Sequence, residues 1–222
     1  MSRHEPDPGA AERLTSAARR IVDLVRRTNA SGESAEQALA ALERAAELLE
    51  AHAHPGPWAQ RTLGFEGALA PIGKPHDFTE FFPYSPLIGS RNPLAPPARF
   101  EIRGGRVHGS VRFGAAYVGP PASVHGGVIA ALFDELLGCA NLANEVGGMT
   151  GTLRVKYLSP TPVGEDLSLE GWVERVDGRK VFTRGTIHHG DTLTAEADGV
   201  FIQGSMQRFI ERFSAAARPE GE

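Results

Sequence analysis

The stretch that most constrains the fold runs from Val128 to Ala143. Almost every residue in it is apolar or glycine, and the exceptions are Asp134, Glu135 and Asn141. No polar face is left that is wide enough for an ordinary surface helix, so the pattern predicts a helix buried on all sides. A carboxylate inside such a helix is costly to desolvate unless it is paired or changes its pKa, which makes Asp134 and Glu135 candidates for chemistry.

Strand patterns flank this helix on both sides. Before it, Gly104-Gly105 separates two short alternating runs between 98 and 113, which predicts a hairpin. After it, where Gly147-Gly148 is expected to end the helix, apolar and polar residues alternate in four runs, at 152–157, 167–174, 181–188 and 192–203. An antiparallel sheet wrapped around the helix would bury one face of each strand and all of the helix, so the sequence predicts an α+β fold.

The chain begins with a helical extension, residues 1–54. Apolar residues recur there at helical spacing in two runs, Leu14, Ala17, Ile21 and Leu24, then Ala38, Leu42, Ala45 and Leu49. The segment 29–32 breaks the two runs, and Ser34 with Gln37 resembles a capping box. We expect a helical hairpin that packs on its own or a partner subunit, with a dedicated partner-binding module as the alternative.

Residues 55–97 form a second extension of different texture. Nine prolines and clustered aromatic residues, Phe78, Phe81, Phe82 and Tyr84, accompany an absence of sustained periodicity. The apolar content is too high for a disordered linker, so we expect an irregular arm lying across the main domain. It either packs as a simple extension or covers a pocket or subunit interface. The main domain is expected over 98–204, followed by a tail over 205–222.

Composition excludes several classes of function. The net charge of −4 and the lack of a basic run with interleaved aromatics argue against a nucleic-acid partner. Cys139 is the single cysteine and is expected to be a small buried residue, which excludes an internal disulfide and fits a reducing compartment. The segment Met1 to Ala18 lacks an apolar signal core, and the central apolar run is too short and too acidic for a membrane span. We expect a cytoplasmic protein with no membrane partner.

No metal site is expected either. His188 and His189 lie near Asp191, but adjacent strand residues face opposite ways and the cluster caps a turn. No pattern in the chain calls for a cofactor.

The most specific motif is His125-Gly126-Gly127, with Asp134 seven residues after the second glycine and Tyr157-Leu158-Ser159-Pro160 after the next strand. This ordered set, preceded by the loop 119–124, resembles the hotdog-fold acyl-CoA thioesterases of the phenylacetate-pathway (PaaI) type. The resemblance covers about residues 84–203. It implies a hotdog fold that forms a homodimer or a dimer of dimers, with two equivalent sites at the subunit interface.

The resemblance also implies roles for individual residues. The Gly126 backbone N–H would polarise the thioester carbonyl, Asp134 of the other subunit would be the base or nucleophile, and Thr150 would help to hold water. Some relatives place an Asn or an acidic residue in the loop before the triplet, where this chain has Val118 and Gly119. That departure removes a second polar group from the expected site.

The spacing of the motif supports a shared site independently. Unpaired N–H groups at a helix start carry partial positive charge, and glycines at 126 and 127 would let a substrate oxygen approach closely. Asp134 returns to nearly the same helix face as Gly127 but about 10 Å along the axis. One acyl carbonyl cannot touch both groups of one subunit, so a second subunit is required.

The residues next to the motif are expected to have other roles. Glu135 is rotated by about 100° from Asp134 and is expected to be a structural partner for a buried base or backbone group. His125 either fixes the loop by bonding to nearby backbone or acts in proton transfer. For the CoA phosphates, the resemblance points to Arg179 and Lys180, after the Asp177-Gly178 turn.

The predicted function is hydrolysis of acyl-CoA to free acid and CoA. A non-catalytic acyl-CoA-binding or regulatory hotdog protein remains an alternative, as does an acyl-thioester hydratase, although the Asp-to-His spacing expected for the latter is missing. Nothing in the sequence identifies the acyl group.

Overall fold

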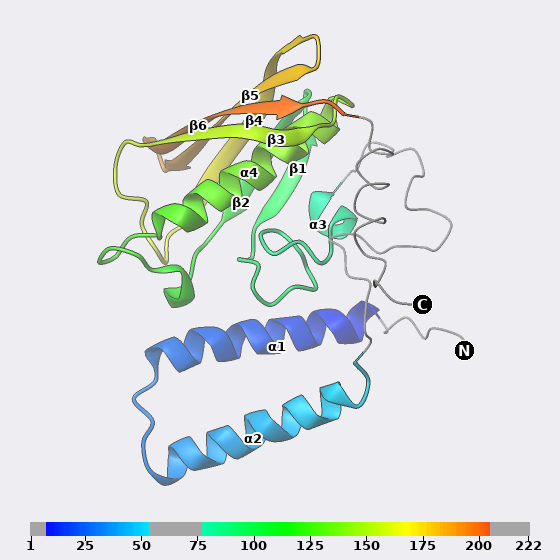
Figure 1. Ribbon diagram of the computed structural model, residues 1–222. Helices are drawn as coiled ribbons and strands as arrows, with labels where there is room; N and C mark the ends of the chain where they lie inside the picture. The colour runs from blue at the N-terminus through cyan, green and yellow to red at the C-terminus, as the bar shows by residue number, and fades with distance from the viewer. Residues whose placement is uncertain (1–7, 54–76, 205–222) are drawn as a thin grey trace, which may run out of the picture.

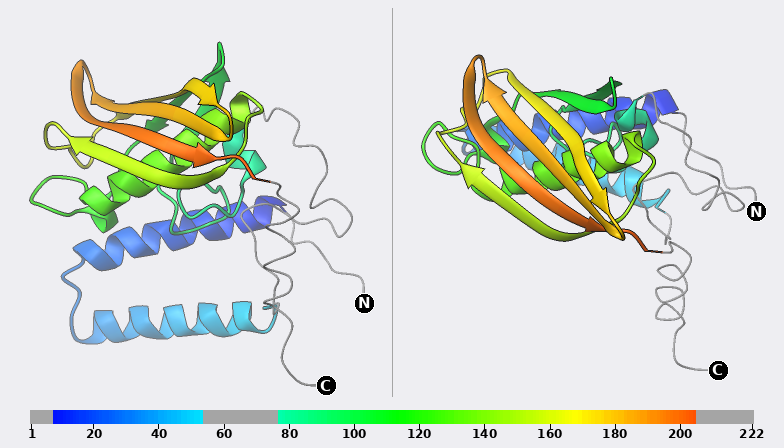
Figure 2. Two further views of the ribbon diagram at one scale, coloured as in Figure 1. Left: turned by 45° about the horizontal axis from the view of Figure 1, so that its top comes forward. Right: turned by 90° about the horizontal axis from the view of Figure 1, so that it is seen from above.

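A computed structural model describes residues 8–53 and 77–204 (Figure 1). One antiparallel sheet of six strands has the order β1-β2-β4-β5-β6-β3. Its strands are β1 (Arg99–Arg103), β2 (Arg106–Val111), β3 (Met149–Tyr157), β4 (Leu167–Asp177), β5 (Lys180–His189) and β6 (Thr192–Ile202). The long helix α4 (Gly126–Ala143) lies across one face of the sheet (Figures 1 and 2). The predicted α+β architecture is therefore confirmed.

Glycines let α4 lie close to the sheet. Gly171 of β4 pairs with Gly185 of β5, and Gly199 lies on β6. A Cβ added at Gly171 would fall 2.8 Å from the Leu136 Cγ, and one at Gly199 would fall 2.9 Å from the Leu137 Cδ1. Side chains at these positions would therefore push the helix away from the strands that bury it.

The sequence predicted the hairpin before α4 correctly, but it did not predict where α4 ends. The β1–β2 hairpin is confirmed, with Gly104 and Gly105 at φ of 58° and 76° as a two-residue turn requires. The expected end of the helix at Gly147-Gly148 is wrong, because α4 ends at Ala143. The Asn144 amide donates to the carbonyls of Ala140 and Gly105, both at 2.8 Å, and so caps the helix before the glycines are reached.

The helix is not buried on all sides, contrary to the expectation from its composition. Its residues Gly127 and Asp134 are exposed, and the face that carries them lies beside β3, the last strand of the sheet. Because no strand of the described chain lies beyond β3, one side of α4 is left without cover by residues 8–53 and 77–204.

Length and composition alone would let α4 cross a membrane, and among the described residues it is the one helix that passes this test. The expectation that the run is too short for a membrane span is therefore wrong. Half of the 18-residue stretch is buried in the fold, as in the core helix of a soluble protein, which explains its apolar character without a membrane.

The N-terminal hairpin is formed by α1 (Pro8–Arg27) and α2 (Glu33–Glu50), as the two helical runs predicted (Figure 1). The expected capping box is wrong. Gly32 is the N-cap of α2 and gives no side-chain bond, while the Gln37 amide donates to Glu33 at 3.0 Å. α2 has no buried residue.

The described part of the arm, residues 77–97, lies against the main domain. Its short helix α3 (Phe78–Phe81) is capped by Asp77, which accepts from the Thr79 N–H at 2.7 Å. Phe78 is fully buried in the core cluster that includes α4. The rest of the predicted arm, 55–76, and the predicted tail, 205–222, lie outside the described residues, as do residues 1–7 and 54 of the helical extension.

Candidate active site

The start of α4 holds one unsatisfied amide. His125 is the N-cap, and its Nδ1 accepts the Gly127 N–H at 3.0 Å. The His125 carbonyl accepts the N–H groups of Val128 and Ile129, at 2.9 and 3.2 Å. Within the described part of the chain, the Gly126 N–H is thus the first-turn donor left without an acceptor, at the positive end of the helix dipole.

The backbone N–H groups of the two glycines predicted to contact substrate therefore differ in their hydrogen bonding. The Gly126 N–H is available to an incoming oxygen, whereas the Gly127 N–H is engaged by the His125 ring. Gly127 is exposed, and a Cβ there would lie 3.2 Å from the His125 ring, so its lack of a side chain makes room for that ring. The His125 ring, as placed, orients the first turn.

The backbone around the triplet is held from three directions. The His125 N–H donates to the Tyr117 carbonyl at 2.8 Å, and the Val124 N–H donates to the Thr161 carbonyl at 2.8 Å. The Tyr157 hydroxyl donates to the Gly126 carbonyl at 2.8 Å. Sequence reasoning gave Tyr157 no role, although it is the first residue of the Tyr-Leu-Ser-Pro segment that carried the resemblance.

Close packing at Gly119 explains why this position carries neither an Asn nor an acidic side chain. A Cβ at Gly119 would lie 2.6 Å from the His125 Cα, closer than real Cβ atoms approach. The loop and the triplet are therefore in backbone contact, and an Asn or Asp at 119 would displace His125. The residue to which Gly119 bonds is Ser123, whose carbonyl accepts its N–H at 2.9 Å.

Asp134 lies on the uncovered face of α4 and is exposed. The Thr150 hydroxyl donates to its Oδ1 at 2.7 Å. A β-bulge makes this contact possible, because Gly151 is an extra residue between the pairs Thr150–Phe201 and Thr152–Val200. Strict alternation would put Thr150 on the outer face with Thr152, and the bulge turns it toward the helix.

Glu135 occupies the opposite kind of environment. It is half-buried, and its Oε1 accepts from the Ser85 hydroxyl of the arm at 2.8 Å. Burial raises the pKa of Glu135 and the nearby Asp134 charge adds to this, while the Ser85 hydrogen bond opposes it. The expected base or backbone partner is thus corrected to a hydroxyl, which no sequence signal marked.

One protomer does not bring Gly126 and Asp134 to a common point. Eight residues of helix separate them, or about 12 Å along the axis. Gly126 lies beside Tyr157 at one end of β3, whereas Asp134 lies beside Thr150 near the other end. One protomer therefore holds both chemical groups but keeps them apart in two half-sites, one with the Gly126 N–H and one with the Asp134 carboxylate.

The predicted phosphate-binding residues lie on the β4–β5 turn and are exposed. The Arg179 Nε donates to the Gln203 carbonyl at 2.9 Å. Lys180 pairs with Ile202, and Ile202 pairs on its other side with Met149 of β3. The turn therefore shares an end of the sheet with the Thr150–Asp134 pair and lies away from Gly126.

The remaining reactive residues are placed apart from these half-sites. Cys139 is 2% exposed, and burial raises the pKa of its thiol well above the ordinary value, so it is not poised for nucleophilic attack. Across residues 8–53 and 77–204, no three His, Cys, Asp or Glu side chains are grouped to hold a metal ion, the His188-His189 turn included.

Comparison with known proteins identifies the family. The family model described as "Thioesterase superfamily" matches residues 122–196. A solved thioesterase superfamily protein, RHA08564, is 35% identical, with 90% of this chain and 94% of that chain covered and a TM-score of 0.75. This chain belongs to the thioesterase superfamily, and the predicted hotdog fold is confirmed.

Curated relatives match over a shorter region. Acyl-coenzyme A thioesterase THEM4 of Xenopus laevis is 39% identical over 87 residues, which are 38% of this chain and 39% of that protein. Acyl-coenzyme A thioesterase THEM5 of Homo sapiens is 31% identical over 93 residues, 40% of this chain and 37% of that protein. The match thus spans about two fifths of the length of these relatives.

Proposed function

We propose that this chain hydrolyses acyl-CoA thioesters to a free acid and CoA. The observation that carries the proposal is the pair of half-sites on α4: one free amide at Gly126 and one solvent-facing carboxylate at Asp134, held by Thr150. Membership of the thioesterase superfamily and the names of the THEM4 and THEM5 relatives support the same reaction.

The Gly126 N–H would donate to the thioester carbonyl oxygen. That oxygen gains negative charge as the carbonyl carbon becomes tetrahedral, so a fixed donor at the positive end of a helix stabilises the transition state more than the ground state. The cap by His125 keeps the neighbouring amide occupied, and Tyr157 fixes the Gly126 peptide from its carbonyl side.

The partner subunit's Asp134 would supply the attack. In one route its carboxylate takes a proton from water while the water oxygen bonds to the carbonyl carbon, and the C–S bond then breaks to release the CoA thiolate, which takes up the proton. In the other route the carboxylate itself attacks the carbonyl carbon, and the C–S bond breaks to release the CoA thiolate. Water then hydrolyses the resulting anhydride to the free acid and the Asp134 carboxylate, and the proton that is released goes to the thiolate. Thr150 occupies Oδ1 in either case and leaves Oδ2 to react.

A homodimer, alone or paired into a tetramer, would complete the site. The uncovered face of α4 lies beside β3, an edge strand with no partner beyond it in the sheet. An unpaired edge next to an exposed helix face is a surface that a second copy can cover. We place the CoA phosphates near Arg179 and Lys180, the exposed cations at the end of the sheet that holds Thr150 and Asp134.

The test is a panel of short-chain, long-chain and aryl acyl-CoA substrates, with release of the free CoA thiol as the readout. Turnover of at least one class is expected, and the preferred class identifies the acyl group. Binding of these compounds without turnover of any of them would overturn the proposal and favour an acyl-CoA-binding protein.

A further inference from the structure

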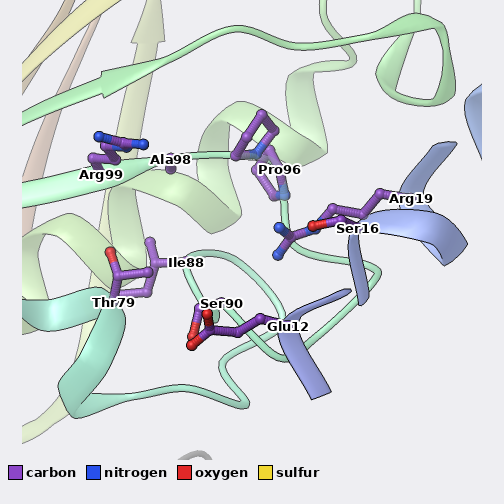
Figure 3. Close-up of a pocket in the computed structure, with 10 residues that line it drawn as sticks. Glu12, Ser16, Arg19, Thr79, Ile88, Ser90, Pro96, Ala98 and Arg99 are labelled. Carbon is purple, nitrogen blue, oxygen red and sulfur yellow. The ribbon is translucent and has the colours of Figure 1, made fainter. Parts of the chain in front are cut away.

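The helix α1 docks on the main domain through its polar side. The Arg19 guanidinium donates to the carbonyls of Gly89 and Asn92, the latter at 2.9 Å, and the Asp23 Oδ1 accepts the Ala115 N–H at 3.0 Å. Thr15, on the same side, is 6% exposed. Figure 3 shows Arg19 and Glu12 around a cavity of about 220 Å³ between α1 and the arm.

The apolar stripe of α1 points elsewhere. Leu14 and Val25 are 53% and 62% exposed, and Ile21 and Leu24 are 38% and 39% exposed. An amphipathic helix ordinarily buries its apolar side and leaves its polar side in water. Here the arrangement is inverted, so the stripe is a surface that the main domain does not cover.

The second helix also exposes its apolar side, and none of its residues is buried by the described part of the chain. Its leucines are all exposed: Leu39, Leu42, Leu48 and Leu49. At 100° per residue, the leucines of α2 and all of its alanines except Ala40 cover an arc of about 180°. Contact with one neighbouring helix would use about 100° of that arc, whereas a helix inside a bundle has two neighbours.

The two helices carry opposite charge. α1 has five arginines and two carboxylates, a net charge of +3, and α2 has five glutamates and one arginine, a net charge of −4. Each apolar face is therefore bordered by charges that suit the other helix and disfavour a copy of itself.

We propose that the α1–α2 hairpin is a self-association surface, and that its occupant is the hairpin of a second copy of this chain. The basic α1 of one copy packs against the acidic α2 of the other, and two hairpins form a four-helix bundle. Closure of α2 onto its own α1 would also match the charges, but it would give α2 one neighbour and leave half of its apolar arc in water. The proposal does not depend on the hydrolytic site.

Disulfide trapping between two differently tagged full-length chains tests this directly. One chain carries Ile21→Cys on α1 and the other carries Leu42→Cys on α2, and the native Cys139 is buried and does not compete. The control replaces Leu42→Cys by Arg44→Cys, on the polar face of α2. After mixing and mild oxidation, the 21–42 crosslink between chains should exceed the 21–44 crosslink at least tenfold. Equal yields would overturn the proposal, because they would leave either closure within one chain or another occupant.

A charge exchange gives a second readout. Arg20→Glu in the first chain should lower the 21–42 yield several-fold, and Glu43→Arg in the second chain should restore it, because the pair then meets across the two copies. A yield that neither change affects would contradict charge-guided pairing. Both substitutions lie on exposed positions remote from Gly126 and Asp134, so acyl-CoA turnover should stay unchanged.

Discussion

The two sides of α4 carry consecutive carboxylates with different surroundings. Glu135 faces the arm, where its own chain covers it and supplies a hydroxyl from Ser85. Asp134 faces outward beside β3, where the described part of the chain supplies the Thr150 hydroxyl and no cover. The difference indicates that the arm covers one side of the helix, whereas the described residues leave the other side exposed, which is the side that the proposed site uses.

Removal of the exposed carboxylate should have the largest effect. Asp134→Asn keeps the size and the bond to Thr150 but loses the base or nucleophile, so kcat for acyl-CoA hydrolysis should fall by about 10²–10⁴-fold. The thermal midpoint should stay close to that of the wild type because the residue is exposed. Glu135→Gln is the matched control one residue away and should retain most of the turnover. Equal losses of kcat in both variants would show that the two carboxylates do not differ in function.

Removal of the free amide should come next. Gly126 is the first helical residue and His125 has an extended backbone at φ −60° and ψ 130°, so Gly126→Pro fits the backbone and deletes only the N–H. Loss of this donor should lower kcat by about 10²–10³-fold. Gly126→Ala keeps the N–H, and its Cβ would meet the Tyr157 ring at an acceptable 3.4–3.5 Å. A Pro variant as active as the Ala variant would exclude the amide from catalysis.

On the arm side, the expected effect is on stability. Ser85→Ala removes the partner of a half-buried carboxylate and the acceptor for the N–H groups of Leu87 and Ile88. The free energy of unfolding should fall by about 1–3 kcal/mol, as measured by denaturant titration. Turnover at a temperature where the variant is folded should change little. A large loss of kcat with unchanged stability would place Ser85 and Glu135 in the chemistry.

The smallest expected effect is a change in how the free energy of unfolding depends on pH. Burial raises the pKa of Glu135 in the folded protein above its unfolded value. Its contribution to stability is therefore complete below the unfolded pKa and declines as pH rises through the folded pKa. Glu135→Gln should flatten this decline and stabilise the protein at neutral pH relative to the wild type. A steeper decline in the variant would mean that the carboxylate is stabilised as an anion.

The outline of the fold was predictable because its signals are local. Alternation marked the strands, and the apolar run marked α4, since burial imposes a period on each element. The composition of α4 gave one wrong prediction, which was burial of the helix on all sides. An apolar run shows that a helix needs cover, but it does not show whether the cover comes from its own chain or from a second one.

The site was predictable only in part. The triplet and Asp134 stand out by their spacing, whereas Thr150 reaches the carboxylate through a bulge at Gly151 that alternation does not reveal. The choice between the amides of Gly126 and Gly127 depends on the ring orientation of His125. Ser85 is 50 residues from Glu135, and no pattern in the sequence links them.

In the proposed dimer, each site takes Gly126 from one subunit and Asp134 from the other. Co-expression of Asp134→Asn and Gly126→Pro chains under different tags allows the mixed dimer to be purified and assayed for acyl-CoA hydrolysis. In that dimer one site has both groups intact and the other has neither, so turnover per dimer should be about half that of the wild type, although each parent is nearly inactive. A mixed dimer as inactive as its parents would contradict the account, because both groups would then have to come from the same subunit.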